Sequence, residues 1–205
     1  MRKDELIREL IDSGALRTKA VIAAFEKVSR ENFISKEHEK YAYANYPLPI
    51  AAGQTISQPL TVAAMTEALE VNNGDKVLEV GAGSGYQAAI LSVIVGSRGK
   101  IITTEIIPEL FEFAKKNLKN YKNVTLLNID GSLGYEKEAS YDRIIVTASA
   151  PTVPKPLLEQ LKEDGRMVIP VEDRMLILEK KGNKIKENFI GYYSFVPMRG
   201  KHGHE

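Results

Sequence analysis

The chain has 205 residues, of which 43% are hydrophobic and 27% charged, and its 28 basic and 27 acidic side chains leave a formal net charge of +1. This length and composition predict one globular domain over residues 1–205. The lack of a long apolar run, of excess positive charge and of cysteine excludes a spanning helix, a strongly basic surface and any thiol chemistry. Together with the charged, amphipathic N-terminus, it predicts a cytoplasmic protein whose partners are neither membranes nor nucleic acid.

Residues 1–60 begin with two predicted helices. Apolar side chains recur at helical spacing between Asp4 and Ile11, and Gly14 provides a stop. A second apolar face follows within 21–28. Neither helix is long, so we expect both to pack against a larger core.

A loop rich in aromatic residues and proline follows these helices. It covers Tyr41–Ile50 and includes Pro47 and Pro49, which we expect to prevent regular strand pairing. Loops of this kind often cover a neighbouring site. We therefore expect residues 1–60 to form a helical, substrate-covering segment on a cofactor-binding core of residues 61–205.

From residue 76 onward, strands alternate with helices. Apolar, β-branched runs predict strands at Lys76–Val80, Ile101–Thr104, Val124–Ile129, Arg143–Thr147 and Met167–Val171. Helical patterns predict helices at Tyr86–Ile94, at Glu109–Leu118 after Pro108, and at Lys155–Lys162 with Gly165 as its cap. This alternation is typical of a doubly wound α/β fold with a mostly parallel sheet. The last segments predict an antiparallel hairpin at the sheet edge: Arg174–Lys181, a turn at Gly182-Asn183, and Lys184–Phe195.

The end of the first strand carries the clearest candidate site. In open α/β sheets ligands bind beyond the carboxyl ends of the strands. There the sequence places an acidic residue and then a glycine-rich turn, in the order Glu79, Val80, Gly81, Ala82, Gly83, Ser84, Gly85. Glycines at alternate positions let the backbone turn tightly and approach a ligand, with the amides of the next helix behind them.

Three other strand ends add polar groups to this candidate site. Glu105, next to Ile106, lies 20 residues after the last glycine of the turn, where a carboxylate can accept both hydroxyls of a ribose. Asp130 and Gly131 follow the third strand, where we expect the carboxylate to accept from an adenine amino group. Thr147 follows the fourth strand. The combination predicts an adenosine-type ligand.

The same turn distinguishes between adenosine cofactors. A dinucleotide fingerprint needs glycine at position 86, which is Tyr86, and no Walker lysine is present. Glu79 would repel a phosphate but suits the ammonium group of a methionine moiety. We therefore expect S-adenosylmethionine, with S-adenosylhomocysteine as product, in preference to NAD.

Residues 53–59 form a distinctive element, Gly53-Gln54-Thr55-Ile56-Ser57-Gln58-Pro59, which generic methyltransferases lack. This element is typical of the protein-L-isoaspartate (D-aspartate) O-methyltransferases, and the sequence resembles that family over nearly the whole chain. The other matching stretches are Tyr41-Ala42-Tyr43, Pro47-Leu48-Pro49-Ile50, the 77–87 loop, Asp130-Gly131, Ile144 to Thr147 with Pro154, and Phe195-Val196-Pro197.

The resemblance implies a Rossmann-like class I methyltransferase and an acceptor: the free carboxylate of L-isoaspartyl residues, and more weakly D-aspartyl side chains, in damaged proteins and peptides. It also implies that Ser57 is the active-site serine and that Gln54, Thr55 and Ile56 shape the wall between cofactor and acceptor. A carboxylate is ionised at neutral pH and needs no general base. The alternative role for Ser57 is to cap the helix that begins near Pro59.

The C-terminal tail offers weaker candidates. Arg199 could hold a substrate carboxylate, although a solvated cation is the favoured interpretation. His202 and His204 are interpreted as part of a frayed tail, so no metal site is expected.

Other functions remain open on the sequence. One is a different S-adenosylmethionine-dependent enzyme that methylates RNA or a small molecule. Another is a noncatalytic protein that only binds an adenosine cofactor. A nitrogen acceptor is disfavoured because residues 147–151 lack an Asp/Asn-Pro-Pro-aromatic run.

Overall fold

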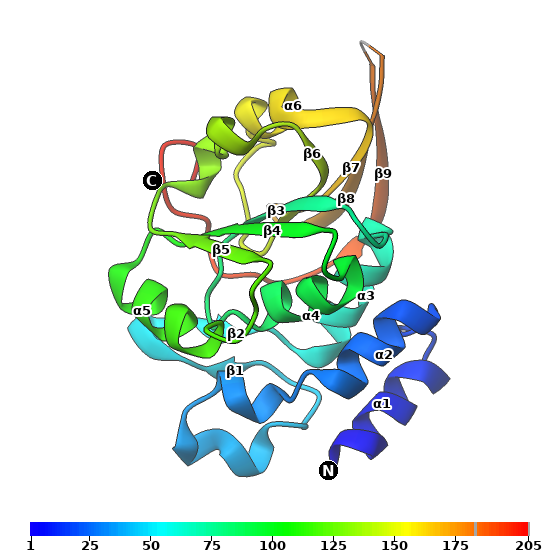
Figure 1. The fold of residues 1–205 in the computed structure, drawn as a ribbon, viewed down its shortest axis with the longest axis vertical. Coiled ribbons are helices and arrows are strands. Elements are labelled where there is room, and N and C mark those ends of the chain that lie inside the picture. Colours follow the sequence, from blue (N-terminus) through cyan, green and yellow to red (C-terminus); the bar gives the residue numbers. More distant parts are fainter. Residues whose placement is uncertain (183, 205) are drawn as a thin grey trace.

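A seven-stranded sheet forms the centre of the molecule (Figure 1). The computed structural model describes residues 1–182 and 184–204. The strand order is β5-β4-β3-β6-β7-β8-β9; the first five strands in this order are parallel, and β8 and β9 are antiparallel. The strands are β3 (Lys76–Val80), β4 (Lys100–Thr104), β5 (Val124–Leu127), β6 (Tyr141–Val146), β7 (Leu161–Val171), β8 (Arg174–Lys181) and β9 (Lys184–Tyr192). The predicted α/β fold with an antiparallel C-terminal hairpin is confirmed.

Helices cover both faces of this sheet. They are α1 (Lys3–Asp12), α2 (Lys19–Lys27), α3 (Pro59–Leu69), α4 (Tyr86–Val95), α5 (Pro108–Asn117) and α6 (Lys155–Gln160). The hydrophobic cluster on one face joins side chains of α1 to α5, whereas α6 and Met198 belong to the cluster on the other face. Within the described ranges, no helix is long and apolar enough to cross a bilayer.

The central strand β3 shows why the core divides into these two clusters. Val77 faces the first cluster, whereas Leu78 and Val80 face the second, as the alternation of side chains along a strand requires. Because β3 lies between β4 and β6, the chain reverses its direction of travel across the sheet at this strand. Such a reversal leaves a crevice at the carboxyl ends of the strands.

The loop that follows α2 is more ordered than its prolines predict. It contains short 3₁₀ turns and a two-stranded pair, in which β1 (Leu48–Pro49) runs antiparallel to β2 (Thr55–Ile56). The expectation that Pro49 prevents regular pairing is therefore wrong. Proline removes only its own N–H, and the amide of Ile50 donates to the carbonyl of Gln54 at 2.8 Å, which holds the pair together.

The boundary between α6 and β7 also differs from the prediction. The helix ends at Gln160 rather than Lys162, and Gly165 lies inside β7 rather than capping the helix. Leu161 is 1% exposed and already pairs with Tyr141 of β6, after which the register shifts. A Cβ at Gly165 would lie 2.7 Å from the Lys162 carbonyl oxygen, so this close approach requires glycine.

The last hairpin has nearly the predicted limits. β9 ends at Tyr192 instead of Phe195, after a register shift opposite Met175. Gly182 adopts a positive φ of 60° in the predicted turn, and Asn183 lies outside the described residues. Similarly, β5 ends at Leu127, two residues earlier than predicted.

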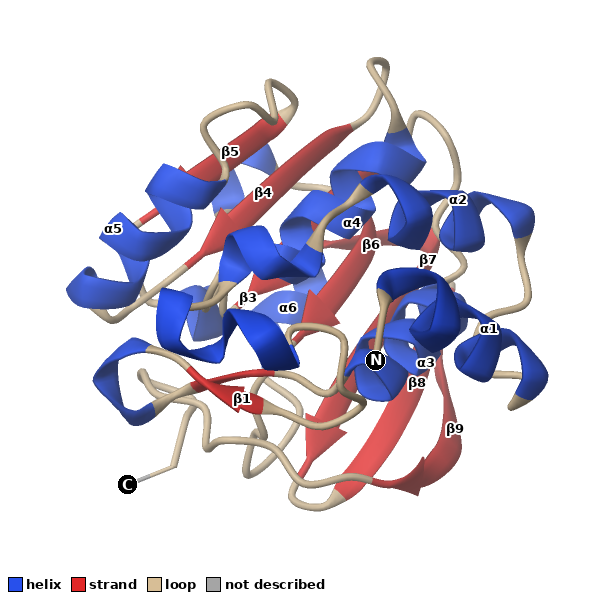
Figure 2. Cartoon of the chain, turned by 90° about the horizontal axis from the view of Figure 1, so that it is seen from below, coloured by secondary structure: helices blue, strands red, loops and turns tan. Residues whose placement is uncertain are grey.

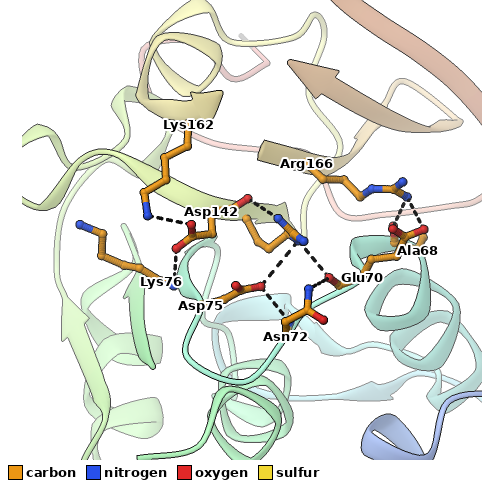
Figure 3. Close-up of polar contacts among 9 residues, drawn as sticks. Ala68, Glu70, Asn72, Asp75, Lys76, Asp142, Lys162 and Arg166 are labelled. Carbon is orange, nitrogen blue, oxygen red and sulfur yellow. Dashed lines mark hydrogen bonds and ion pairs between the residues drawn. The ribbon is translucent and has the colours of Figure 1, made fainter. Parts of the chain in front are cut away.

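A polar network holds together the amino ends of β3, β6 and β7 (Figure 3). The carboxylate of Asp142 accepts from the Lys76 amide at 2.8 Å and from the Lys162 ammonium at 2.7 Å. Arg166 donates to the Ala68 carbonyl and pairs with Glu70, both at 3.0 Å. These groups lie at the opposite end of the strands from the crevice, so we assign them to stability rather than chemistry.

Replacing Asp142 tests this assignment. Although partial burial opposes it, the hydrogen bonds from Lys162 and the Lys76 amide hold the pKa of Asp142 below its ordinary value. The carboxylate therefore stabilises the fold at neutral pH, and that contribution is lost as pH falls through its lowered pKa. We expect Asp142→Asn to lower the free energy of urea unfolding by about 1–3 kcal/mol at pH 7, with a smaller cost in acid and unchanged cofactor binding.

Asp164→Asn is the matched control for this prediction. Asp164 pairs with Lys181 at the surface, where its side chain is 70% exposed, and such pairs contribute little. An unfolding free energy of Asp142→Asn equal to that of the control at pH 7 would contradict the assignment.

Candidate functional site

The cleft at the carboxyl ends of β3, β4 and β6 brings together segments from the whole chain. Figure 2 shows β1 lying beyond the arrowheads of these strands. The predicted residues that line the cleft are Gln54, Thr55, Ile56, Ser57, Glu79, Gly81, Ala82, Gly83, Ser84, Glu105, Ile106, Gly131 and Thr147. Two predicted residues, Gly85 and Asp130, are not part of its lining.

The three glycines of the turn serve different purposes. All have positive φ, at 96° for Gly81, 53° for Gly83 and 87° for Gly85. A Cβ at Gly81 would lie 2.6 Å from the Thr147 hydroxyl, and one at Gly85 would lie 2.9 Å from Leu118, so both positions are closed by packing. A Cβ at Gly83 would make an ordinary van der Waals contact with Ile50, at 3.8 Å. Of the three glycines, Gly83 is therefore the one whose position packing leaves open.

Glu105 holds the glycine turn in place. Its side chain is buried, and its two carboxylate oxygens accept from the Gly83 amide and the Ile107 amide, each at 2.9 Å. Each oxygen has a second lone pair, so the carboxylate can still accept a hydrogen bond from a hydroxyl group of a ligand. The position expected to bind a ribose therefore also joins the tips of β3 and β4.

Glu79 is the least satisfied polar group of the cleft. It is 0% exposed, and neither carboxylate oxygen has a hydrogen-bond partner among the described residues. Burial raises the pKa of Glu79 to about 8; the negative charge of Glu105 adds to the rise, and the Thr103 hydroxyl opposes it. A buried carboxylate is unfavourable unless a cation meets it. The site thus fits a ligand that carries a positive group.

The loop after β5 brings Asp130 into contact with the C-terminal tail, and its predicted contact with an adenine amino group stays a prediction. The Asp130 carboxylate accepts from the amide and hydroxyl of Ser132 at 2.9 and 2.7 Å, and from the Lys201 amide at 2.8 Å. It is therefore engaged by its own loop and by the C-terminal tail. Gly131 does line the cleft, and a side chain there would collide with Thr104.

Ser57 is held in the cleft wall by the β1–β2 pair. The helix-capping role is taken by Asn45 instead, whose side chain accepts from the Leu60 amide at 3.1 Å in the first turn of α3. The capping position itself is Gln58, which makes no side-chain capping bond. The Ser57 hydroxyl has no partner in the described part of the chain, so it is available to a ligand in the cleft.

The C-terminal tail forms a wall that the sequence analysis missed. Val196 and Met198 exchange backbone hydrogen bonds with Ser149 at 2.8 and 2.7 Å, and the His204 amide donates to the Met198 carbonyl. The interpretation as a frayed tail is therefore wrong, because the chain folds back onto the ends of β5 and β6. Four consecutive residues line the cleft: Val196, Pro197, Met198 and Arg199. The signal available in the sequence was the Phe195-Val196-Pro197 motif.

Comparison with known proteins identifies the family. The family model of protein-L-isoaspartate(D-aspartate) O-methyltransferases matches residues 1–203. This chain belongs to that family. Protein-L-isoaspartate O-methyltransferase 2 of Archaeoglobus fulgidus is 50% identical over 98% of this chain and 94% of its own length. The protein-L-isoaspartate O-methyltransferase of Ignicoccus hospitalis is 55% identical over 84% of this chain and 82% of its own length.

Solved structures share the fold of this chain. A protein-L-isoaspartate O-methyltransferase superimposes with a TM-score of 0.91 at 29% identity, covering 98% of this chain and 67% of the other. A structure from Plasmodium falciparum, in complex with S-adenosyl-L-homocysteine, gives a TM-score of 0.84 at 24% identity and covers 97% of this chain and 99% of the other. The family resemblance found in the sequence is confirmed.

The unpartnered carboxylate leads to a prediction for Glu79→Gln. Because the pKa of Glu79 is raised in the folded state, the folded chain retains a proton that the unfolded chain releases between about pH 4.5 and 8. Wild-type stability should therefore fall by about 1.4 kcal/mol per pH unit across that window through this group alone. We expect the ligand-free variant to be more stable than the wild type at pH 8, with the difference disappearing at pH 4 to 5.

Thermal and urea unfolding at both pH values measure this difference, and the shift in Tm caused by S-adenosylhomocysteine measures binding. That shift should be lost in Glu79→Gln. Glu109→Gln, which removes an exposed carboxylate of α5, is the control and should follow the wild type in both measurements. A Glu79→Gln stability difference that is the same at pH 5 and pH 8 would contradict the prediction.

Proposed function

We propose that this chain transfers the methyl group of S-adenosylmethionine to the free carboxylate of L-isoaspartyl residues, and more weakly of D-aspartyl residues, in damaged proteins and peptides. The observation that carries the proposal is the position of Gln54–Ser57, the segment typical of the family, across the same cleft as the glycine turn. The product ester is a better leaving group than the acid. Spontaneous succinimide formation and hydrolysis then restore some normal aspartate.

The cofactor is assigned to the strand-tip side of the cleft. When bound, S-adenosylmethionine supplies a methyl group on a positively charged sulfur. Glu79 receives a cationic group, Glu105 accepts ribose hydroxyls while it holds Gly83, and Gly131 supports the adenine. The rest of the proposed cofactor surface is Gly81, Ala82, Ser84, Ile106 and Thr147.

The acceptor is assigned to the opposite wall. We propose that the Ser57 hydroxyl donates to the acceptor carboxylate and orients it, while Gln54, Thr55 and Ile56 shape the passage and residues 1–60 cover it. An ionised carboxylate needs no base, and the described cleft lining contains no histidine, lysine or cysteine. The task of the protein is to align two reactants and exclude water, which contributes up to about 7–11 kcal/mol in ideal cases.

Damaged polypeptides are the proposed partners of this enzyme. Because damage occurs in many sequences, we propose that the groove grips peptide backbone more than particular side chains. We place the activity in the cytoplasm, since a chain without cysteine gains nothing from an oxidising compartment.

Paired peptides test the function directly. Two peptides that differ only in an aspartyl or isoaspartyl linkage are incubated with the protein and methyl-labelled cofactor. We expect label on the isoaspartyl peptide alone, released by mild base as expected of an ester. Cofactor binding without labelling of either peptide would favour a noncatalytic protein. Base-stable label on RNA or on a small molecule, each supplied in a parallel reaction, would favour another methyltransferase.

Ser57→Ala tests the role of the serine. Loss of one hydrogen bond to a charged group costs about 1.5–3 kcal/mol, so we expect kcat/KM for the isoaspartyl peptide to fall about 10- to 100-fold. The Kd for S-adenosylhomocysteine should stay within about twofold. Ser97→Ala, at an exposed position at the opposite end of the sheet, is the control. Turnover of Ser57→Ala equal to that of the control would remove Ser57 from the site.

A further inference from the structure

The charges of the cleft are unevenly placed. The charged side chains of its described lining are Glu79, Glu105 and Arg199. The two carboxylates lie on the strand-tip side, where the cofactor is assigned. With the cationic group of the cofactor assigned to Glu79, the Glu105 carboxylate is the negative side chain that an anionic acceptor meets, and Arg199 is the cationic side chain of the described lining that can offset it.

The backbone on both sides of Arg199 is fixed. Met198 is 3% exposed, and its amide donates to the Ser149 carbonyl at 2.7 Å. Gly200 packs directly on the Asp130 carboxylate, and the Lys201 amide donates to the same carboxylate. The tail thus carries Arg199 to one place at the cleft rim.

The guanidinium itself has no competing partner among the described residues. It forms no ion pair or hydrogen bond there, and the side chain is exposed. The Asp130 carboxylate, on which Gly200 packs, accepts from the Ser132 and Lys201 amides and forms no ion pair with Arg199 in the described structure. An anchored backbone with an uncommitted cation at the rim of a cleft is the arrangement expected of a residue that pairs with an incoming anion.

We propose that Arg199 is the counter-ion of the acceptor carboxylate and sets the preference of the cleft for anionic acceptors. This inference rests on the proposed function. The planar guanidinium can present two parallel N–H groups to a carboxylate and so hold its orientation. During transfer an oxygen of that carboxylate bonds to the methyl carbon as the carbon–sulfur bond breaks, and the electron pair of that bond stays on sulfur.

The change in charge during this step removes the ion pair between Arg199 and the acceptor carboxylate. The carboxylate becomes a neutral methyl ester, and the sulfonium becomes a neutral thioether. Arg199 therefore loses its ionic partner when the reaction is complete. Arg199 attracts the carboxylate of the substrate but not the neutral ester of the product, so product release is favoured.

Binding measurements separate this proposal from catalysis. The ligands are an isoaspartyl peptide and the same peptide with that carboxylate replaced by a carboxamide, each titrated into the protein saturated with S-adenosylhomocysteine. We expect the wild type to prefer the acid by about tenfold or more, the effect of a partly exposed, charge-assisted pair. Arg199→Met should remove this preference by weakening the binding of the carboxylate peptide alone. Arg199→Lys should restore part of the preference.

Kinetics and a matched variant complete the test. Arg199→Met should raise KM for the peptide about tenfold and make it insensitive to salt, with kcat and the Kd for S-adenosylhomocysteine within about twofold. Lys201→Met removes a neighbouring exposed cation outside the cleft lining and should follow the wild type. An acid preference in Arg199→Met equal to that of the wild type overturns the inference. If the wild type methylates the isoaspartyl peptide in that case, the proposed function stands; if it neither binds nor methylates the peptide, both fail.

Discussion

The double hydrogen bond of the Glu105 carboxylate ties together the tips of β3 and β4, on which the cleft depends. By accepting from Gly83 and Ile107 at once, it joins the turn after β3 to the start of the chain after β4. The glycine turn can therefore keep the positive φ values that bring its backbone to the cleft. The Gly81 and Ala82 amides are held by the Thr104 carbonyl, whereas Glu105 is the acceptor of the Gly83 amide in the described chain, so this link fixes the middle of the turn.

The two ends of the strands are used for opposite purposes. At the amino end, acids and bases are paired, as in the contacts of Asp142 and Arg166. At the carboxyl end, the buried Glu79 carboxylate has no hydrogen-bond partner among the described residues. Arg199 lies at the rim of the cleft and likewise has no ion-pair partner among those residues. A buried carboxyl group without a partner lowers stability, so the position of Glu79 is expected where a ligand completes the pairing.

The cleft is closed by the parts of the chain that are farthest apart in sequence. The β1–β2 pair comes from the first 60 residues, and Val196–Arg199 comes from the last ten. Each is fixed by backbone hydrogen bonds rather than by apolar burial alone. The proposed acceptor side of the site therefore lies on segments outside the parallel sheet, while the proposed cofactor side lies on the strand tips.

The sequence by itself determined the alternation of strands and helices, the glycine turn, the positions of Glu79 and Glu105 and the family. These features depend on local properties: side-chain periodicity, the conformational freedom of glycine, and short motifs. The tertiary structure decided that Pro49 pairs within a strand, that Asn45 leaves the Ser57 hydroxyl unbound, that the tail engages Asp130, and that Arg199 reaches the cleft. The first three contacts join groups 6, 15 and 71 positions apart, and Arg199 and Ser57 share a cleft at a separation of 142 positions. Such contacts depend on how the whole core packs, which no local pattern encodes.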